Sequence, residues 1–405
     1  MSAMRTAAVP KIVDTVARSF VVAAAFGYAV DLIQQTRDHL TNGAGRPFGD
    51  DFINYWSGAF LALSGRAGEV YDFDAFHAFE QTVTGAAIQY YHYSYPPVLL
   101  LMSAPFALAP YVPALFLWLT ASWFAFWRAL RAAMPQGGAL LFALATPAVL
   151  INAIGGQNGA WTAALFGGGL TLIDRRPHLA GMLLGLLIYK PQIGLLIPVA
   201  LAAGRHWRAF AAAATTAGGL LLASALVFGF DMWTHYLANV TVLRHVILED
   251  GTGVWHRMVS VFVAARRLGA PVDAAYAAQA FAALLAAVAV AFVWFRDAPA
   301  HLKNAVLMLG TCLATPYLQD YDLVFGALAV AWLWQEPVEV YRSERALQIA
   351  CALVRLLPLT AAALARLSGL CFGPLFILPA FALALRAALA TRATETAALP
   401  ASHRA

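Results

Sequence analysis

This chain has few charged residues for its length. Only 12% of its 405 residues are Asp, Glu, Lys or Arg, whereas 61% are hydrophobic. Soluble domains have about 25% charged and about 45–50% apolar residues, so this composition cannot cover a protein of this size with polar surface. The low charge argues against a soluble globular protein and predicts an integral membrane protein.

Motifs for metal, redox and nucleotide chemistry are also missing. The cysteines Cys312, Cys351 and Cys371 lie in apolar segments, without metal-site spacing or an obvious disulfide pattern. We interpret them as buried apolar side chains. The sequence contains no P-loop, no Rossmann glycine fingerprint, no G-x-S-x-G and no H-E-x-x-H. We therefore expect no required cofactor, and no haem, zinc or nucleotide site.

The net charge of +5 does not indicate a nucleic-acid partner. The basic residues occur in short clusters between apolar runs, as in cytoplasmic loops of membrane proteins. Near the N-terminus, Arg5, Lys11 and Arg18 precede the apolar stretch SFVVAAAFGYAVDLI, which could be taken for a signal peptide. No clean small-residue cleavage site follows it, so we expect a retained first membrane span.

Long apolar segments are abundant, and they predict an all-α, multi-pass membrane bundle of about 12 helices. The candidate spans are 18–36, 96–128, 138–153, 158–173, 179–190, 192–204, 208–229, 274–295, 302–316, 320–334, 346–365 and 370–390. The pair Pro96-Pro97 and Pro191 should start or break helices. The segment 96–128 is too long for one straight crossing, so we expect it to contain a short re-entrant piece followed by a span.

The distribution of Lys and Arg predicts the orientation. With a cytoplasmic N-terminus and a single crossing at 96–128, most arginines fall on the inner side. The outer face then receives the loop 37–95, GGQNG at 155–159, YKPQ at 189–192, the loop 230–273 and PYLQDYD at 316–322. Polar groups at membrane depth are costly and usually functional. We expect one membrane domain, residues 1–395, with one extracytoplasmic site and a disordered cytoplasmic tail, 396–405.

The stretch GDDFINYWSGA at 49–59 places an acidic pair beside amide and aromatic side chains. A carboxylate held near the membrane surface could act as a general base for a hydroxyl nucleophile. The alternative is an aspartate that caps a helix beginning at Phe52. Both roles can hold, with Asp50 capping the helix and Asp51 acting as the base.

Polar residues of other segments can likewise be interpreted in two ways, as structural residues or as ligand-binding residues. Gln157 and Asn158 either bind a hydroxyl-rich ligand or form a polar turn. Lys190, between two apolar half-segments, either snorkels to the interface or meets an anion such as a lipid-linked phosphate. His256 and Arg257 either lie in a solvated loop or contact phosphate, which the guanidinium fork matches well.

Aromatic and acidic residues complete the candidates. The segment YYHYSYPP at 90–97 is either an interfacial aromatic belt or a wall that binds a sugar or a prenyl chain. Asp320 and Asp322 precede an apolar segment, where they could bind sugar hydroxyls, hold a divalent cation or cap the following helix. Nothing in the sequence requires the cation.

The order of these motifs resembles glycosyltransferase family 87. The stretch DFINYW is followed by SGRAGEVYDFDAF, YSYPPVLLLMSAPFALAP, GQN, KPQ and PYLQDYDLV, and the similarity extends from about residue 45 to 335. The resemblance implies a GT-C membrane fold, a polyprenyl-phosphate-sugar donor and a catalytic aspartate in the first outer loop. This aspartate maps best to Asp51, with Asp50 as the second candidate.

We therefore predict an inverting membrane glycosyltransferase of the bacterial plasma membrane. It would move a hexose, mannose first, to a lipid or glycan acceptor on the extracytoplasmic face. The predicted donor-phosphate ligands are Lys190, His256 and Arg257, and the predicted sugar-binding residues are Asn54, Tyr55, Tyr95, Gln157, Asn158, Gln192, Asp320 and Asp322. Two alternatives stay open: a transporter or flippase of a lipid-linked sugar, and a non-catalytic subunit of an envelope-assembly complex.

Overall fold

The computed structural model describes residues 11–397, and the regular secondary structure in this range is helical, with no β-strand. The α-helices are α1 (Lys11–Gln34), α2 (Phe52–Leu63), α3 (Phe73–Thr84), α4 (Val98–Ala107), α5 (Tyr111–Ala133), α6 (Ala139–Leu144), α7 (Pro147–Ile154), α8 (Gly159–Leu172), α9 (Pro177–Gly185), α10 (Pro191–Gly194), α11 (Ile197–Ala203), α12 (Trp207–Phe228), α13 (Asp231–Leu243), α14 (Val261–Arg267), α15 (Val272–Phe295), α16 (Ala300–Ala314), α17 (Gly326–Leu333), α18 (Glu344–Ser368) and α19 (Gly373–Ala397). Short 3₁₀ segments are η1 (Ala67–Tyr71), η2 (Leu186–Tyr189), η4 (Asp320–Val324) and η5 (Val338–Tyr341), and η3 (Arg244–Glu249) is π-helical.

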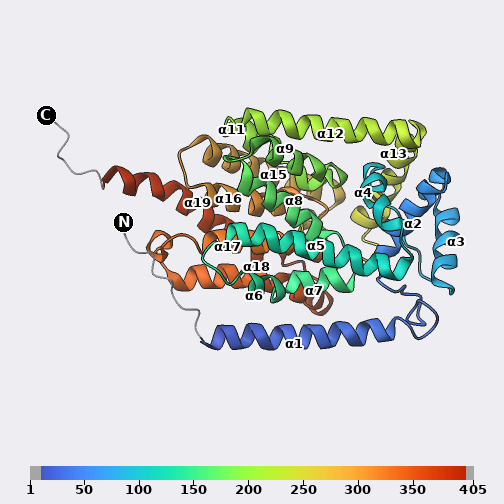
Figure 1. Cartoon of the computed structure of the whole chain (residues 1–405). Helices are drawn as coiled ribbons and strands as arrows, with labels where there is room; N and C mark the ends of the chain where they lie inside the picture. Colours follow the sequence, from blue (N-terminus) through green and yellow to red (C-terminus); the bar gives the residue numbers. More distant parts are fainter. Residues whose placement is uncertain (1–10, 398–405) are drawn as a thin grey trace.

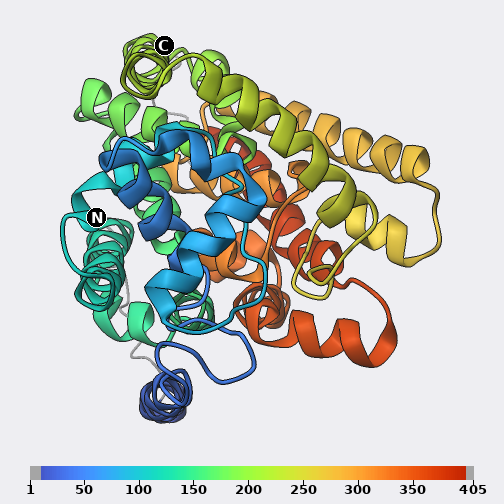
Figure 2. The ribbon, with the colours of Figure 1, turned by 90° about the vertical axis from the view of Figure 1, so that its right-hand side faces the viewer.

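The long helices lie roughly side by side along the length of the molecule (Figure 1). The helices α2, α3 and α13 gather at one end, which we call the cap end, and Figure 2 looks onto this end. The 37–95 segment, expected as a loop, thus contains two α-helices of its own. Only residues 1–10 and part of the predicted tail, 398–405, lie outside the described range.

Five helices in the described range are long and apolar enough to cross a membrane: α1, α12, α15, α18 and α19. A sixth candidate is the pair α4 and α5. The expected count of about 12 spans is therefore not confirmed. The apolar segments between 138 and 204, and those at 302–334, form helices shorter than the roughly 20 residues that a crossing needs.

Proline explains where several of these shorter helices begin. Pro147, Pro177 and Pro191 each occupy the first position of a helix, where the missing N–H has no intrahelical partner to lose. The segment 96–128 is broken as its prolines predict. Its two helices, α4 and α5, are bent by 115° relative to each other across a break of no more than 4 residues.

Small residues let the central helices approach closely. α9 packs along α12, and a Cβ at Gly181 would lie 2.2 Å from the carbonyl oxygen of Ala209. A Cβ at Gly167 of α8 would lie 2.4 Å from Leu328. Interfaces of this kind are common between membrane helices, because small residues allow the backbones to come together.

Helix α1 is packed differently from this centre. It makes its contacts chiefly with α6 and α7, and none of its apolar window is buried within the protein. Figure 1 shows it as a separate rod along one edge of the molecule. Its apolar side chains therefore lie on the outside of the protein, as expected of a helix that faces lipid.

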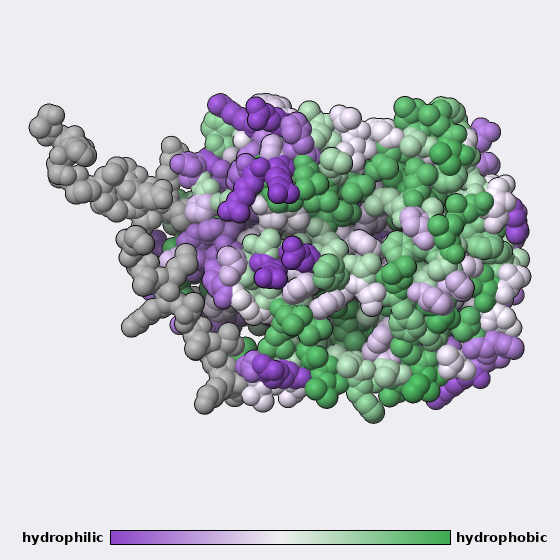
Figure 3. Space-filling model, in the orientation of Figure 1, coloured by the Kyte–Doolittle hydropathy of each residue, from purple (hydrophilic) through white to green (hydrophobic). Residues whose placement is uncertain are grey.

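Hydrophobic residues cover much of the middle of the face shown in Figure 3, and hydrophilic residues gather towards its two ends. Contacts between helix ends assemble the end away from the cap end. The Gln335 side chain donates to the carbonyl of Ala133, Arg386 donates to the carbonyl of Tyr341, and Arg205 lies over the ring of Phe295. Arg205 and Arg386, which the sequence assigns to the inner side, take part in these contacts. The side of the membrane that this end faces stays a prediction.

Candidate active site

A cavity of about 330 Å³ lies at the cap end, between segments that are far apart in the sequence. Its walls come from α2, the 92–96 stretch, the turn before α8, the junction of η2 with α10, α13 with η3, and residues 317–321. Seven of the predicted site residues line it: Asp51, Asn54, Tyr55, Tyr95, Gln157, Lys190 and Gln192.

Asp51 immediately precedes α2, and its carboxylate lies on the cavity wall. It accepts hydrogen bonds from the side-chain amides of Gln157 and, at 3.5 Å, Asn54. Burial and the neighbouring Asp50 raise the pKa of Asp51 to about 7, against the lowering effect of Arg257 and Arg46. A carboxyl group that gives up its proton near neutral pH is suited to general-base catalysis.

The short distance between the Asp51 and Gln157 loops depends on Gly156. Its φ is +57°, and a Cβ at this position would lie 2.1 Å from the carbonyl oxygen of Gly49. Only glycine has both the backbone freedom and the small size for this contact. The GGQNG turn can therefore lie directly against the residues that precede α2.

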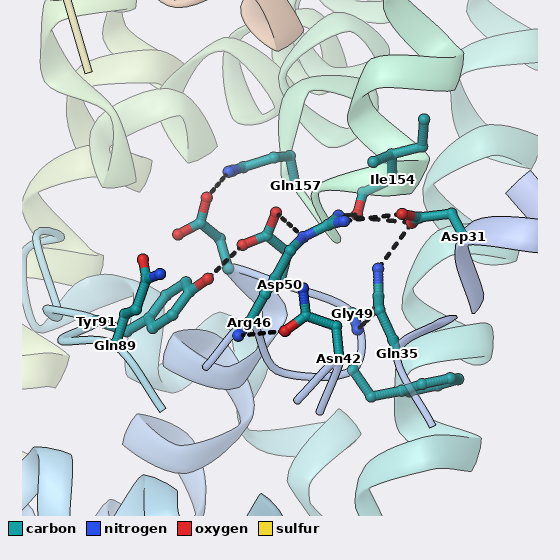
Figure 4. Close-up of polar contacts among 12 residues, drawn as sticks. Asp31, Gln35, Asn42, Arg46, Gly49, Asp50, Gln89, Tyr91, Ile154 and Gln157 are labelled. Carbon is teal, nitrogen blue, oxygen red and sulfur yellow. Dashed lines mark hydrogen bonds and ion pairs between the residues drawn. The ribbon is translucent and has the colours of Figure 1, made fainter. Parts of the chain in front are cut away.

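Asp50 has different surroundings from its neighbour. The Nε of Arg46 donates to one carboxylate oxygen at 3.0 Å, and the hydroxyl of Tyr91 donates to the other at 2.6 Å (Figure 4). The described residues that line the cavity do not include Asp50. α2 begins at Phe52 as expected, but Asp50 turns away to Arg46 and Tyr91, and no side chain caps this helix. The prediction that Asp50 caps it is therefore wrong.

Tyr55 connects the polar groups on one side of the cavity. Its hydroxyl donates to Oε1 of Gln157 at 2.8 Å, accepts from Asn158 at 3.2 Å and lies 3.1 Å from the hydroxyl of Tyr95. Because Oε1 of Gln157 is occupied by this hydroxyl, the amide NH₂ of Gln157 is left to face Asp51. The network orients the amide that holds the candidate base.

Lys190 lines the cavity, whereas its partners Asp322 and Asn158 do not, and we call these three residues the floor. The Nζ of Lys190 donates to Asp322 at 2.5 Å and to Asn158 at 3.0 Å, and it lies 4.7 Å from the centre of the Tyr321 ring. The side chains of the ion pair are only 1% and 0% exposed. The snorkelling interpretation of Lys190 is therefore wrong. Asp322 also accepts from the N–H of Gln319 at 3.1 Å, so the predicted capping role of one of the two acids is confirmed.

Two other ion pairs form what we call the rim. The Nε and Nη2 of Arg257 each donate to Asp320 at 3.1 Å, and Arg244, which lines the cavity, lies 3.2 Å from Glu249. Burial raises the pKa of Asp320, and the Arg257 guanidinium opposes this rise. Arg257 also lowers the pKa of Asp51, so its charge acts on the candidate base although its side chain does not form part of the cavity wall.

The sequence model of glycosyltransferase family 87 matches residues 93–316, more than half of the chain. The chain belongs to glycosyltransferase family 87. This family assignment makes it a membrane glycosyltransferase, with a sugar donor and an acceptor as substrates. No curated protein and no solved structure shows significant similarity to the chain.

The structure of this glycosyltransferase does not bring His256 to the cavity. Its Nε2 lies 3.0 Å from the guanidinium of Arg366, outside the cavity wall. Burial lowers the pKa of His256, and the nearby guanidinium groups of Arg366 and Arg257 lower it further. An imidazole with a lowered pKa that does not line the cavity is a weak candidate for contacting the donor phosphate.

The sequence analysis missed one wall of the glycosyltransferase cavity, because it treated 230–273 as a loop. Helix α13 and η3 supply this wall through Tyr236, Val240, Leu243, Arg244, Ile247 and Leu248. Residues 236, 240, 243 and 247 have the three- and four-residue spacing of one helical face, and this signal was present in the sequence. His92, Ser94, Tyr189, Tyr317, Gln319 and Tyr321 also line the cavity, all in motifs that the sequence had singled out.

Proposed function

We propose that this glycosyltransferase moves a hexose, mannose in the first instance, from a polyprenyl-phosphate sugar to a lipid or glycan acceptor, with Asp51 as the general base. One observation carries the proposal. The Asp51 carboxylate lies on the wall of a cavity with both polar and apolar lining, held by Gln157 and Asn54, with a pKa raised to about 7.

The two unlike walls of the cavity support an amphipathic donor. Tyr55, Gln157 and Lys190 offer hydrogen bonds on one side, whereas Val240 and Ile247 offer aliphatic surface on the other. At about 330 Å³ the space is within the range of small-molecule sites, roughly 300–1,000 Å³. A sugar phosphate fits the polar side, and the first isoprene units of a lipid fit the aliphatic side.

The proposed reaction transfers one proton and one glycosyl group. Asp51 takes the proton from the acceptor hydroxyl while that oxygen attacks the anomeric carbon. The bond from the anomeric carbon to the phosphate oxygen breaks, the configuration inverts, and polyprenyl phosphate leaves with the electron pair. The ammonium of Lys190 has three N–H donors and uses two on Asp322 and Asn158, so one is left for the departing phosphate.

The proposed setting is the bacterial plasma membrane, with both termini cytoplasmic and the cavity on the extracytoplasmic side. Reporter fusions test this orientation. A fusion at residue 175 should report cytoplasm and a fusion at residue 250 the outside. The reverse result would discard the orientation while leaving the cavity chemistry in place.

The deciding experiment measures transfer from a panel of radiolabelled polyprenyl-phosphate sugars in membranes that contain wild type, Asp51→Asn or Asp74→Asn. Loss of a general base lowers the rate by roughly 10²–10⁴-fold. Asp74 lies in the first turn of α3 and serves as the matched control, with expected wild-type activity. Full activity of Asp51→Asn would place the base elsewhere, and no transfer by wild type from any donor would reject the donor class.

A further inference from the structure

We propose that Arg46, Asp50 and Tyr91 are positioning residues that hold the backbone before α2 so that the Asp51 carboxylate enters the cavity. This inference rests on the proposed role of Asp51 as the base. It gives Asp50 a function other than the cap or second base expected from the sequence. It also includes Arg46, which the sequence analysis did not single out.

The backbone at Asp50 shows that this position is held in place. Its φ is +50°, in the left-handed region that residues other than glycine rarely adopt. Such a conformation persists only where the surroundings determine it. At Asp50 the surroundings are the two hydrogen bonds from Arg46 and Tyr91, one to each carboxylate oxygen. Asp51 follows directly and has returned to ordinary helical angles, with φ −64°.

Arg46 joins this turn to two separate helices (Figure 4). Its Nη1 donates to Asp31 of α1 at 2.8 Å, and its Nη2 donates to the carbonyl of Ile154, the last residue of α7, at 3.0 Å. Its side chain is 26% exposed, so the charge is partly shielded from water. Through one guanidinium, Asp50 is attached to the first membrane helix and to the helix before the GGQNG turn.

Gln35 strengthens the attachment from the α1 side. Its Oε1 accepts the N–H of Gly49 at 2.7 Å, and its Nε2 donates to Asp31 at 2.7 Å. The residue itself is buried. The segment from Arg46 to Asp51 is therefore held by side-chain contacts at Arg46, Gly49 and Asp50, and Asp51 is the first residue that points to the cavity.

The charges of Asp50 and Arg46 shift the pKa of Asp51 in opposite directions. Asp50 raises the pKa of Asp51, and Arg46 lowers it. Arg257 also lowers the pKa of Asp51, and the buried Glu80, whose own pKa is raised by burial and by Asp51, is a further titratable group in electrostatic contact with it. The tyrosines in electrostatic contact with Asp51 are neutral near pH 7 and include Tyr55, Tyr91, Tyr111 and Tyr317.

Because the two charges have opposite effects on the pKa of Asp51, pH–rate profiles can distinguish a positioning role from a merely structural one. Asp50→Asn keeps an acceptor for Tyr91 and a residue that tolerates the left-handed region, but it removes the negative charge. The acid limb of its pH–rate profile should move to lower pH. Arg46→Gln removes the positive charge, and its acid limb should move to higher pH. General loosening of the fold would not shift the two profiles in opposite directions.

The experiment measures kcat and KM for sugar transfer across pH 5–9 for Asp50→Asn, Arg46→Gln, Asp50→Gly and Asp50→Ala. Asp50→Ala loses both hydrogen bonds and disfavours the left-handed angle, and misplacement of the base should reduce kcat by about 10²-fold. Asp50→Gly restores the backbone freedom alone and should recover part of this loss. Arg66→Gln, in the exposed pair with Glu69, is the control and should match wild type.

The outcomes separate this inference from the proposed function. An inactive Asp51→Asn together with wild-type kcat and unshifted profiles for the Asp50 and Arg46 variants would overturn the positioning role alone. Shifts of both profiles in the same direction would overturn it as well. Active Asp51→Asn would reject the base assignment on which it rests. If Asp50→Ala fails to fold, the opposed shifts of Asp50→Asn and Arg46→Gln still decide the question.

Discussion

The floor and the rim of the cavity are built from the same kinds of charge but differ in their access to water. In the floor pair, Lys190 and Asp322 are 1% and 0% exposed. In the rim pair, Arg257 is 23% exposed and Asp320 is 4% exposed. The sequence gives little sign that the two pairs differ, because both aspartates lie in the same PYLQDYD motif. Residues two apart in sequence thus form pairs with different physical properties.

The difference in exposure should affect stability. A buried ion pair contributes little net stability, but breaking it leaves an uncompensated charge in a dry environment. A partly exposed pair loses less when its partner is removed, because water takes the partner's place. Loss of one partner from the floor pair should therefore cost more stability than loss of one partner from the rim pair of Arg257 and Asp320.

Replacing the floor cation should have the largest effect. Lys190→Met leaves Asp322 buried without its partner, which should destabilise the protein by about 3–5 kcal/mol. Thermal unfolding in detergent measures the loss, and Arg257→Met at the rim, as the matched variant, should lose clearly less. The double variant Lys190→Met/Asp322→Leu should recover most of it. Equal losses at floor and rim would remove the distinction between them.

The charge state of Asp51, which lines the cavity, should dominate the pH dependence of transfer. The base acts deprotonated, and its pKa is raised from 3.8 to about 7, so the rate should rise with pH and level off above about 7. At pH 6 it should be about tenfold below the maximum. A profile of kcat/KM that stays flat down to pH 5 would contradict this prediction.

The raised pKa of Asp51 also makes the stability of the folded protein depend on pH. Because burial disfavours the charged carboxylate, the folded state binds the Asp51 proton more tightly than the unfolded state. The stability from this group is full below pH 3.8 and is lost as pH rises through about 7. Asp51→Asn should therefore unfold at a higher temperature than wild type at pH 8 and not at pH 4. A uniform change at both pH values would show that the substitution acts through packing.

Removing the rim guanidinium should have a moderate effect on activity. Arg257→Gln removes a positive charge that lowers the pKa of Asp51, so its acid limb should move to higher pH. If the rim also contacts the donor phosphate, the donor KM should rise by roughly fivefold, or ~1 kcal/mol. Arg366→Gln, at an arginine that contacts His256, is the control. Unchanged KM and pH profile would exclude Arg257 from both roles.

The smallest effect is expected at Arg244. Its side chain is 52% exposed, and exposed ion pairs contribute little. Arg244→Gln should change the donor KM by less than about threefold at low salt, with the difference fading at higher ionic strength because exposed charges are screened. A change as large as that of Arg257→Gln, persisting in salt, would move Arg244 from the rim into the substrate contacts.

Long apolar helices were predicted well from the sequence. The expected spans 208–229 and 274–295 correspond to Trp207–Phe228 and Val272–Phe295, because uninterrupted apolar runs with polar ends mark such helices clearly. The expected spans between 138 and 204 are not confirmed, because these segments form short helices. Hydrophobicity shows that a segment avoids water but not whether lipid or protein surrounds it, and α8 is apolar because it is buried among α5, α9 and η4.

The motifs that line the cavity were also found from the sequence, whereas their pairings were not. Which aspartate faces the cavity depends on one left-handed residue, Asp50, and a backbone angle of this kind cannot be deduced from residue type alone. The contact between Lys190 and Asp322 joins positions 132 residues apart. Such a contact follows from the packing of several helices, and local patterns in the sequence do not predict it. The assignment of sugar-binding roles stays a prediction.

The long separation within the floor pair also sets an order of events during biosynthesis. Chains grow at about 5–20 residues per second, so Asp322 is added roughly 7–26 s after Lys190, which precedes it by 132 residues. During this interval the ammonium has no carboxylate partner from the floor. A nascent chain truncated before η4 never acquires one. The floor pair can therefore form only after the chain has been made as far as η4.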